Sequence, residues 1–261
     1  MKDLRTYGAA PYSVAVIHGG PGAPGQMAPV ARELSRNRGV LEPLQTAATL
    51  DGQVAELHDI IAKHGNPPVV LIGSSWGAML GYIFTARYPA LVSKLIMVGS
   101  AVFDDRYAAG IQKTRLSRLD AEAKREVYSL VKELNDDTVG DKDRLLKRLG
   151  ELFTKADAYD PVTLDTEVIE VRFDIHEGVW GDAMKLRGSG ELLEMGRKIK
   201  CPVVAIHGDF DPHPADGVER PLSQVLKNFR FIMLERCGHL PWIEREAMGR
   251  FYELVRGELG S

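Results

Sequence analysis

Continuous apolar runs divide the 261-residue chain at regular intervals. Five runs are clear and a sixth, interrupted by Pro43, is weaker: residues 14–17, 69–72, 95–98, 203–206, 231–234 and 40–45. Strands buried on both faces of a parallel sheet have this pattern, whereas half-exposed strands alternate. Amphipathic segments of helical period separate the runs, for example at Val54, Leu57 and Ile61. The repeated order predicts an α/β fold, with a mostly parallel sheet covered by helices on both faces.

The alternation of strands and helices stops between residues 102 and 196, where the chain is charged and helical. Two apolar stripes at helical spacing run through this segment: Val127, Leu130, Val131 and Leu134, then Leu145, Leu149, Leu152 and Phe153. Asp120 suits the N-cap of the first helix. We expect a core of residues 1–101 and 197–261, with residues 102–196 as a helical cap inserted between two strands. This cap is either an elaboration without function or a lid over the carboxyl ends of the strands, where such sheets bind ligands.

Composition excludes several classes of protein. Apolar residues make up 44% and charged residues 26%, which indicates a globular chain rather than a disordered one. The net charge is −3 and no basic cluster is present, so we expect no nucleic-acid partner. No apolar run approaches the roughly 18 residues of a membrane span, and the run at 14–17 is too short for a secretion signal. Cys201 and Cys237 are too few for a disulfide framework. We expect a cytoplasmic protein, and the oligomeric state stays open.

The segment GSSWG, residues 73–77, follows an apolar run and leads into a helical pattern. A Gly-x-Ser-x-Gly sequence is weak evidence by itself, because it can arise by chance in a chain of ordinary composition. Between a strand and a helix, its small residues allow a tight elbow that exposes the central hydroxyl at a helix N-terminus. This context predicts Ser75 as a nucleophile. Ser74 is the competing serine, but it is not central between the glycines.

A serine hydroxyl needs a neighbouring base, and that base needs a carboxylate to orient it. His239, in RCGHLPWIE, follows the last apolar run, so it is expected at the same carboxyl edge of the sheet as Ser75. The loop HGDFDPHP follows the preceding run and offers Asp209 and Asp211. Asp211 lies deeper in the loop, before a proline-fixed turn, and is the preferred acid.

The same loop contains His207 and His213, so that four potential metal ligands alternate along it. No second group of ligands stands out elsewhere in the sequence, and we therefore expect neither a metal nor a cofactor.

The segment HGGPG, residues 18–22, follows the first apolar run. Glycine lets the backbone approach a ligand and proline stiffens the loop, so these residues can present N–H groups to a developing oxyanion. By itself, a glycine-rich turn without function explains the segment equally well. Its expected position beside the predicted nucleophile, acid and base favours the catalytic interpretation.

Together these motifs resemble the α/β-hydrolase superfamily over nearly the whole chain. HGGPG, GSSWGAML, IHGDFDPHP and CGHLPWIE stand where that family has its oxyanion loop, nucleophile elbow, acid and histidine, in the family's Ser–Asp–His order. The pair HGGPG and SWG is similar to the proline iminopeptidase branch, the serine aminopeptidases. The resemblance implies the α/β-hydrolase fold, Ser75 as nucleophile, Asp211 as acid and His239 as base, with the amides of Gly20 and Trp76 as oxyanion donors.

This chain differs from those peptidases in four features. Ser74 stands where they usually carry glycine, and Ala78 stands where they carry a hydroxyl residue. Few residues precede the first apolar run, so the family's N-terminal hairpin is expected to be short or absent. In those enzymes, acidic residues of the lid hold the substrate's amino terminus, and no stretch of residues 102–196 matches that pattern. Glu177 is a candidate anchor and equally a candidate surface acid.

We therefore expect a cofactor-independent serine hydrolase that cleaves an ester or amide bond of a small molecule or short peptide. An aminopeptidase of the proline iminopeptidase type and a carboxylesterase or lipase-like hydrolase are the alternatives among enzymes. A non-catalytic ligand-binding homologue is the alternative from another class. Phe103, Phe173 and Trp180 are candidates for an apolar wall of the substrate site, although burial within the cap explains them equally well.

Overall fold

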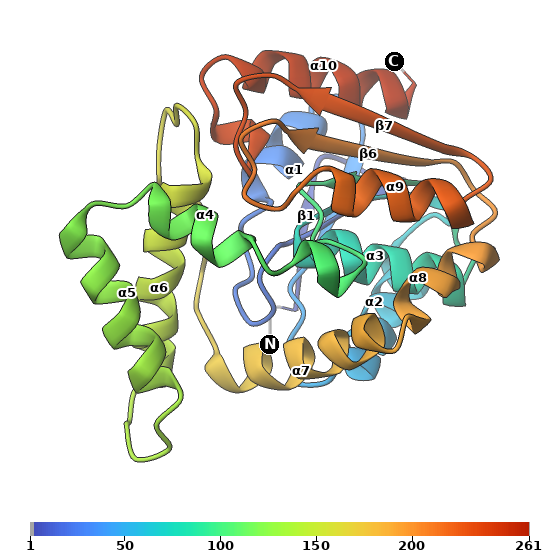
Figure 1. Cartoon of the computed structure of the whole chain (residues 1–261). Helices are drawn as coiled ribbons and strands as arrows, with labels where there is room; N and C mark the ends of the chain where they lie inside the picture. The colour runs from blue at the N-terminus through green and yellow to red at the C-terminus, as the bar shows by residue number, and fades with distance from the viewer. Residues whose placement is uncertain (1–2, 261) are drawn as a thin grey trace.

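The apolar runs of the sequence form neighbouring strands of one sheet in the computed structural model, which describes residues 3–260 (Figure 1). The seven strands are β1 (Leu4–Tyr7), β2 (Tyr12–Ile17), β3 (Gly39–Pro43), β4 (Val69–Ser74), β5 (Val92–Val98), β6 (Val203–Gly208) and β7 (Phe229–Leu234). Their order is β1-β3-β2-β4-β5-β6-β7, and every pair is parallel except β1 with β3. The predicted mostly parallel sheet is confirmed.

Strand β1 was not predicted from the sequence, because its four residues, LRTY, contain no continuous apolar run. It lies at the sheet edge, where one side of the strand needs no partner, and it is only partly buried. The sequence predicts that the family's N-terminal hairpin is short or absent. In the described residues β1 pairs with β3 and not with its neighbour in sequence, β2, so these two strands form no hairpin.

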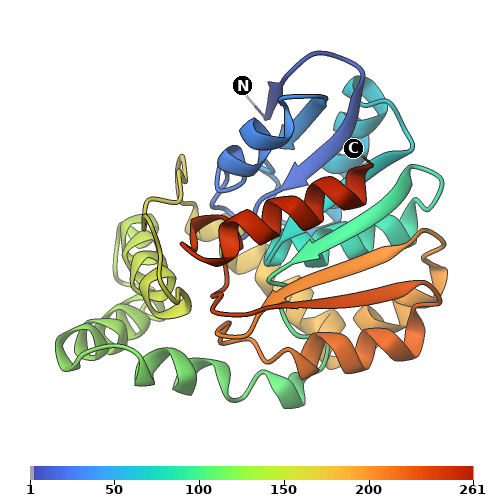
Figure 2. The same cartoon turned by 90° about the horizontal axis from the view of Figure 1, so that it is seen from above.

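Two layers of helices cover the sheet, because alternate residues of each central strand face opposite sides. Leu71 and Leu95 belong to the apolar cluster that contains α2 (Leu50–His64), α3 (Trp76–Arg87) and α9 (Asp216–Val225). Their neighbours Ile72 and Ile96 pair in register and face α1 (Ala28–Leu34) and α10 (Ala247–Leu259). Figure 2 shows α10 lying across this second face. Both faces are thus buried, as the continuous apolar runs predict.

The segment between β5 and β6 is helical, as predicted. It contains η1 (Asp105–Tyr107), α4 (Ile111–Ser117), α5 (Ala121–Leu134), α6 (Lys142–Asp157), α7 (Phe173–Gly188), α8 (Glu191–Glu194) and η2 (Met195–Lys198); the short helix η3 (Pro241–Ile243) precedes α10. The carboxylate of Asp120 caps α5, accepting a hydrogen bond from Ala123 N at 2.8 Å. The predicted N-cap is therefore confirmed.

The helices of this insertion pack in two different ways. Helices α5 and α6 form a hairpin that projects from the sheet, and the two predicted stripes meet between them in an apolar cluster of their own (Figures 1 and 2). Helices α7 and α8 instead share the apolar cluster of the sheet through Val179, Ala183 and Leu192. A separate cap of residues 102–196 stays a prediction, while the packing distinguishes an outer hairpin from an inner pair of helices.

The turn from β4 into α3 lies unusually close to the end of β2. A Cβ atom on Gly77 would lie 2.2 Å from the carbonyl oxygen of Ile17, and one on Gly73 would lie 2.1 Å from that of Gly77. Both distances are far shorter than a van der Waals contact, so only glycine fits at these two positions. This close approach brings the GSSWG turn against the start of the HGGPG loop. None of the helices in residues 3–260 is both long and apolar enough to cross a bilayer.

Replacement of Gly77 by alanine should lower the free energy of unfolding by about 3 kcal/mol or more, because the added methyl group overlaps backbone atoms that cannot move independently. Gly150 in α6 is the matched control, since a Cβ there meets no atom within 4 Å. We expect Gly150→Ala to raise the free energy of unfolding by about 0.5–1 kcal/mol. Urea denaturation of both variants measures the difference, and equal stabilities would contradict the close packing of the turn.

Candidate active site

Ser75 occupies the turn between β4 and α3 in a strained backbone conformation. Its φ of 51° and ψ of −113° lie outside the regions that non-glycine residues favour, at a cost of about 1–3 kcal/mol. Its backbone N–H donates to Val98 O at 2.9 Å, which ties the turn to the end of β5. Trp76 is the first residue of α3, so its amide hydrogen has no acceptor within the helix. The turn therefore presents a half-buried hydroxyl and an unused N–H group at a helix N-terminus.

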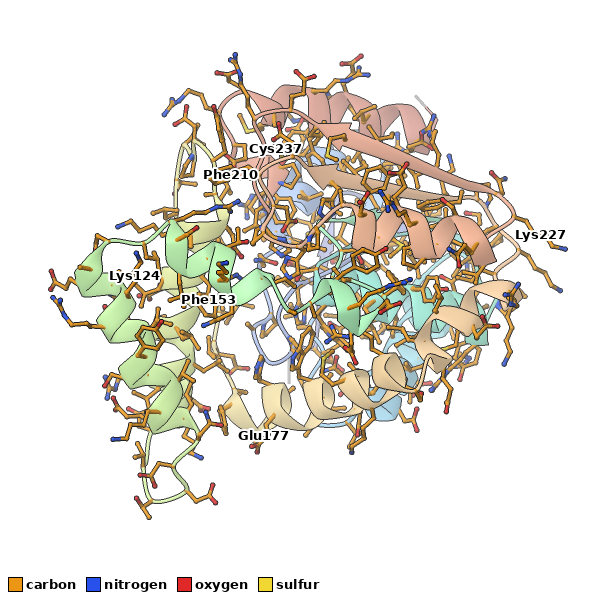
Figure 3. All side chains as sticks on the ribbon, viewed as in Figure 1. Lys124, Phe153, Glu177, Phe210, Lys227 and Cys237 are labelled. Carbon is orange, nitrogen blue, oxygen red and sulfur yellow. The ribbon has the colours of Figure 1, made fainter. Side chains whose placement is uncertain are left out.

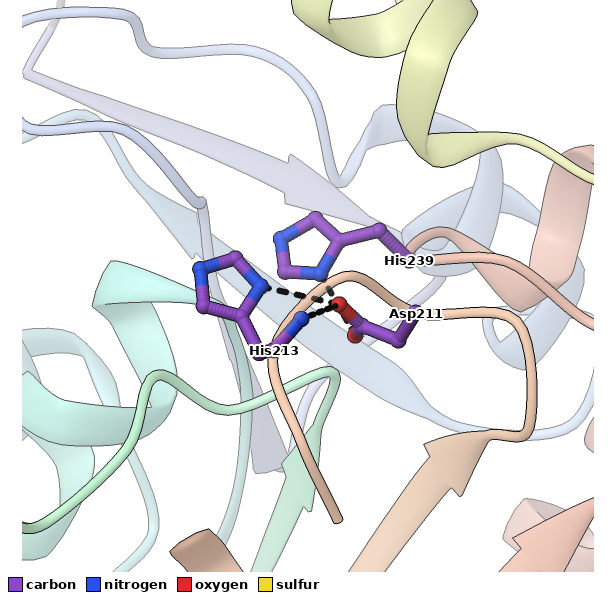
Figure 4. Close-up of side chains that lie close together, drawn as sticks. All are labelled: Asp211, His213 and His239. Atoms are coloured by element: carbon purple, nitrogen blue, oxygen red, sulfur yellow. Dashed lines mark hydrogen bonds and ion pairs between the residues drawn. The ribbon is translucent and has the colours of Figure 1, made fainter. Parts of the chain in front are cut away.

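Asp211 and His239 meet at the carboxyl edge of the sheet, although they come from the loops after β6 and β7. His239 Nδ1 donates to Asp211 Oδ2 at 2.7 Å, and the carboxylate is completely buried (Figure 4). Gly99, at the end of β5, lies against both groups: a Cβ there would be 3.2 Å from His239 Nδ1 and 3.4 Å from Asp211 Oδ2. Asp209, the competing acid, instead accepts a hydrogen bond from Cys237 N at 3.1 Å.

The charges of this pair stabilise one another. Burial alone would raise the pKa of Asp211, but the surrounding His239, His207 and His213 hold it well below its usual range. Burial lowers the pKa of His239, and the adjacent carboxylate outweighs it, so that the pKa is raised overall. The site thus combines an ionised acid with an imidazole that gains a proton readily, as a general base requires.

A second imidazole binds the same carboxylate. His213 donates to Asp211 Oδ1 both from its backbone N, at 2.9 Å, and from its ring Nδ1, at 2.8 Å (Figure 4). Its ring stacks on that of His239 with centroids 4.8 Å apart. The sequence singled out His213 only as one of several potential metal ligands. Its contact with the acid spans only two residues and closes around Pro212, but it was not among the sequence-based predictions.

Asp211, His213 and His239 are also the residues that could hold a metal ion, since their ligand atoms lie within 4.8 Å of one another. In the structure these atoms bind each other, at 2.7 and 2.8 Å, which are the lengths of charge-assisted hydrogen bonds. A metal would have to displace those bonds. The absence of a metal requirement stays a prediction.

The first residue of the HGGPG loop, His18, is a buried and neutral histidine that packs under the loop backbone. His18 is completely buried, which lowers its pKa to about 4, and its Nδ1 lies 2.8 Å from Gly19 O. Gly20 adopts a φ of 59°, a left-handed conformation that glycine tolerates. The amide of Gly19 donates to Gln26 Oε1 at 3.1 Å, and a Cβ on Gly19 would lie 3.2 Å from Ser75 Cβ. The loop therefore reaches the predicted nucleophile.

A cavity of about 1020 Å³ opens beside Ser75. Gly20, Trp76 and His213 line it together with Ser75, and the α5–α6 hairpin and residues 164–171 form its outer wall. The volume suits a substrate of medium size. Within residues 3–260, the hydroxyl of Ser75 makes no hydrogen bond to either imidazole, and such bonds are often long until a substrate is bound.

The three aromatic residues proposed for the substrate wall lie in different places in the structure. Trp180 lines the cavity beside Ser75, where its ring packs edge-on against Trp76 at 6.3 Å. Phe103 is buried against Tyr82 in the core, and Phe173 borders a smaller depression instead. Glu177 borders that depression as well and points away from the sheet, on the outer side of α7 (Figure 3). It is therefore a surface acid.

The segment 158–172 connects the histidine loop with the HGGPG loop. At one end, the buried carboxylate of Glu244 accepts hydrogen bonds from Tyr159 N and Asp160 N, each at 2.8 Å, and from Gly238 N at 2.9 Å. At the other end, Arg172 N donates to Gly22 O at 2.8 Å. We call residues 158–172 the strap. Sequence reasoning missed it, because its partners are distant in the chain.

The preceding residue, Asp157 at the end of α6, joins the helical insertion to the histidine loop. Its backbone oxygen accepts a hydrogen bond from His239 N at 3.0 Å. Arg115 of α4 binds its carboxylate with two nitrogens, at 2.8 Å from Nε and 2.6 Å from Nη2. The Arg115–Asp157 pair is largely buried, and such a bidentate contact fixes the position of Asp157 firmly. Residues of the insertion therefore support the predicted base directly.

Comparison with known proteins gives distant relatives over almost the full length. The chain is 26% identical over 263 residues to 2-hydroxy-6-oxo-2,4-heptadienoate hydrolase of Pseudomonas putida, covering 95% of this chain and 89% of that protein. It is 23% identical over 275 residues to proline iminopeptidase of Lactobacillus delbrueckii subsp. bulgaricus, covering 92% and 87%. A match to human monoacylglycerol lipase ABHD6 is 25% identical over 203 residues and spans only 57% of that protein.

Solved structures share the fold at still lower identity. A point mutant of an epoxide hydrolase from Bacillus megaterium superposes with a TM-score of 0.69 at 17% identity, covering 99% of this chain and 96% of that one. At this identity the similarity shows the fold alone. The family model described as "Alpha/beta hydrolase family" matches residues 3–253. The chain thus belongs to the alpha/beta hydrolase family, as its motifs and its sheet predict.

Proposed function

We propose that the protein is a serine hydrolase that cleaves an ester or amide bond of a small substrate through an acyl-enzyme on Ser75. The observation that carries the proposal is the strained turn at Ser75 beside the buried Asp211–His239 pair, all at one edge of the sheet. A strained turn persists only where surrounding structure enforces it, and such turns are concentrated at functional sites.

In the proposed mechanism, His239 Nε2 takes the proton of the Ser75 hydroxyl as the oxygen attacks the substrate carbonyl. Asp211 holds the ring through Nδ1 and stabilises the imidazolium that forms. The amides of Gly20 and Trp76 are proposed to bind the tetrahedral oxyanion. His239 then protonates the leaving group. In the second half of the reaction His239 takes a proton from water as the water attacks the acyl-enzyme, and it returns that proton to Ser75 as the acid product leaves.

The competing functions differ in what they need from this site. Family members that open epoxides or remove halogens usually attack with an aspartate, so a serine at position 75 favours acyl transfer. An aminopeptidase needs an acidic anchor for the substrate's amino terminus. Glu177 was the candidate, and its position on the outer side of α7 argues against that role. A carboxylesterase or lipase-like activity needs no such anchor.

The nucleophile can be tested by covalent trapping. We expect a serine-directed fluorophosphonate to add its mass to one residue, Ser75, and Ser75→Ala to gain no mass and to lose ester hydrolysis. Ser74→Ala is the matched control, because Ser74 is buried at the end of β4. Intact-mass spectrometry followed by peptide mapping reads the result. An unmodified wild-type protein without hydrolytic activity would favour the non-catalytic binding protein.

The acid can be tested by a matched pair of amides. Asp211→Asn should reduce kcat/KM by about 10³–10⁴ at neutral pH, because an amide does not stabilise the imidazolium. An amide at position 209 can still accept the hydrogen bond from Cys237 N, so Asp209→Asn should change kcat/KM by less than about twofold.

The Asp211→Asn variant should also change the dependence of the hydrolysis rate on pH. Without the Asp211 carboxylate, burial outweighs the weaker attraction of Asp157 and the pKa of His239 falls, so the acidic limb of the rate profile of Asp211→Asn should move to lower pH. A rate profile with the wild-type acidic limb in Asp211→Asn would show that another group orients the base.

The substrate class can be tested by comparing a prolyl arylamide with short- and medium-chain nitrophenyl esters, with Ser75→Ala as the blank. We expect faster hydrolysis of the esters, because the candidate amino-terminal anchor, Glu177, lies outside the cavity. The ratio of kcat/KM values gives the preference. Faster hydrolysis of the arylamide would assign the protein to the aminopeptidases and would require an anchor elsewhere in the cavity wall.

A further inference from the structure

The proposed mechanism uses one of the two imidazoles bound to Asp211, that of His239, and gives no role to the other, that of His213. His213 is held more firmly than a loop side chain usually is. Its backbone N and its Nδ1 both bind Asp211 Oδ1, and its carbonyl oxygen accepts a hydrogen bond from His207 Nε2 at 2.8 Å. Its side chain is only 10% exposed. Such a network fixes the ring in one orientation.

These bonds also fix which nitrogen of the ring carries the proton. The buried carboxylate of Asp211 is ionised and accepts hydrogen bonds only. Because Nδ1 of His213 lies 2.8 Å from it, Nδ1 carries the hydrogen and Nε2 of the neutral ring keeps a free lone pair. In Figure 4, Nε2 lies on the side of the ring turned away from the carboxylate. His213 therefore offers an acceptor in that direction.

His213 stays neutral while His239 takes up charge. Burial lowers the pKa of His213 and outweighs the attraction of Asp211, while the neighbouring His239 lowers it further. The carboxylate of Asp211 binds both imidazoles but favours a positive charge on only one of them. That one is His239, whose pKa is raised. A ring that stays neutral through the reaction retains its acceptor throughout.

The acceptor lies where a substrate must bind. His213 lines the same cavity as Ser75, and its ring is stacked on the ring of the proposed base. A substrate with its carbonyl at Ser75 therefore occupies a cavity that His213 also lines, next to the proposed base. A substrate in the cavity covers Nε2 and removes it from water, and leaving the covered acceptor unpaired is costly, so the site favours a substrate that supplies a donor there.

We propose that Nε2 of His213 is a specificity-determining acceptor, and that the preferred substrates carry an uncharged hydroxyl or N–H donor close to the scissile carbonyl. This inference rests on the proposed hydrolysis at Ser75. An uncharged donor is required, because His239 becomes positive beside His213 during the attack and repels a cationic group. Plain alkyl esters and substrates with an ammonium group at this position are disfavoured.

The test uses pairs of esters that differ only in a donor. Phenyl lactate and phenyl propionate differ by a hydroxyl on the acyl side, while 2-hydroxyethyl butanoate and propyl butanoate differ on the leaving-group side. We expect the wild type to favour the hydroxyl-bearing member of at least one pair by about threefold to tenfold in kcat/KM, as expected for one hydrogen bond. The pair that shows the preference identifies the side on which the donor lies.

Two substitutions separate the two nitrogens of the ring. His213→Asn places an amide N–H near the position of Nδ1, which preserves the bond to Asp211 and removes the acceptor. We expect it to bring the ratio within a pair close to one. His213→Gln places an amide oxygen near the position of Nε2 and should retain part of the preference. His64→Asn, at the exposed end of α2, is the control substitution.

The ratio is measured within one protein preparation, so partial unfolding of a variant cancels. A ratio near one in the wild type, or an unchanged ratio in His213→Asn, would overturn the inference and leave His213 as a support of Asp211. If the wild type hydrolyses no member of either pair and fluorophosphonate leaves Ser75 unmodified, the proposed function fails and this inference fails with it.

Discussion

The close approach of the β4–α3 turn to the end of β2 is the constraint on which the edge of the sheet depends. Gly77 leaves no space for a side chain between the turn and the carbonyl of Ile17, and Gly73 leaves none between the strand and Gly77. The chain accepts the strained backbone of Ser75 because both ends of the turn are fixed. Strand β4 pairs with β2 and β5 on one side of Ser75, and Gly77 packs against the end of β2 on the other. The HGGPG loop, which starts from the same end of β2, is thereby held beside the serine.

The second organising group is the buried carboxylate of Asp211. An isolated buried charge is very unfavourable, and here two ring nitrogens and one backbone N–H compensate it. The histidines in turn hold the loops after β6 and β7 together. Electrostatics therefore makes the two imidazoles unequal, since one carboxylate can stabilise only one adjacent cation well. This inequality separates the proposed base from the proposed substrate contact.

Much of the fold could be predicted from the sequence, because strands buried on both faces leave continuous apolar runs. Strand β1 could not, since a four-residue edge strand buries too little to need an apolar run. The site residues could be named in advance because each stands in a short motif that follows an apolar run, at the expected carboxyl end of a strand. Glu244 is different: its bond to Tyr159 N spans 85 positions and depends on tertiary packing alone. The two bonds of His213 to the acid are local instead, because they span two positions and close around Pro212.

The α5–α6 hairpin has an apolar cluster of its own, whereas the strap is bonded to the HGGPG and histidine loops and helix α7 packs on the sheet. The part of the hairpin distant from Asp157, the last residue of α6, can therefore change in length or composition over evolutionary time without disturbing the elements that hold the proposed nucleophile, acid and base. That outer part of the hairpin is in this sense a replaceable module. Diversification of substrate size can proceed there, while the chemistry close to the scissile bond stays under the control of the rigid inner frame.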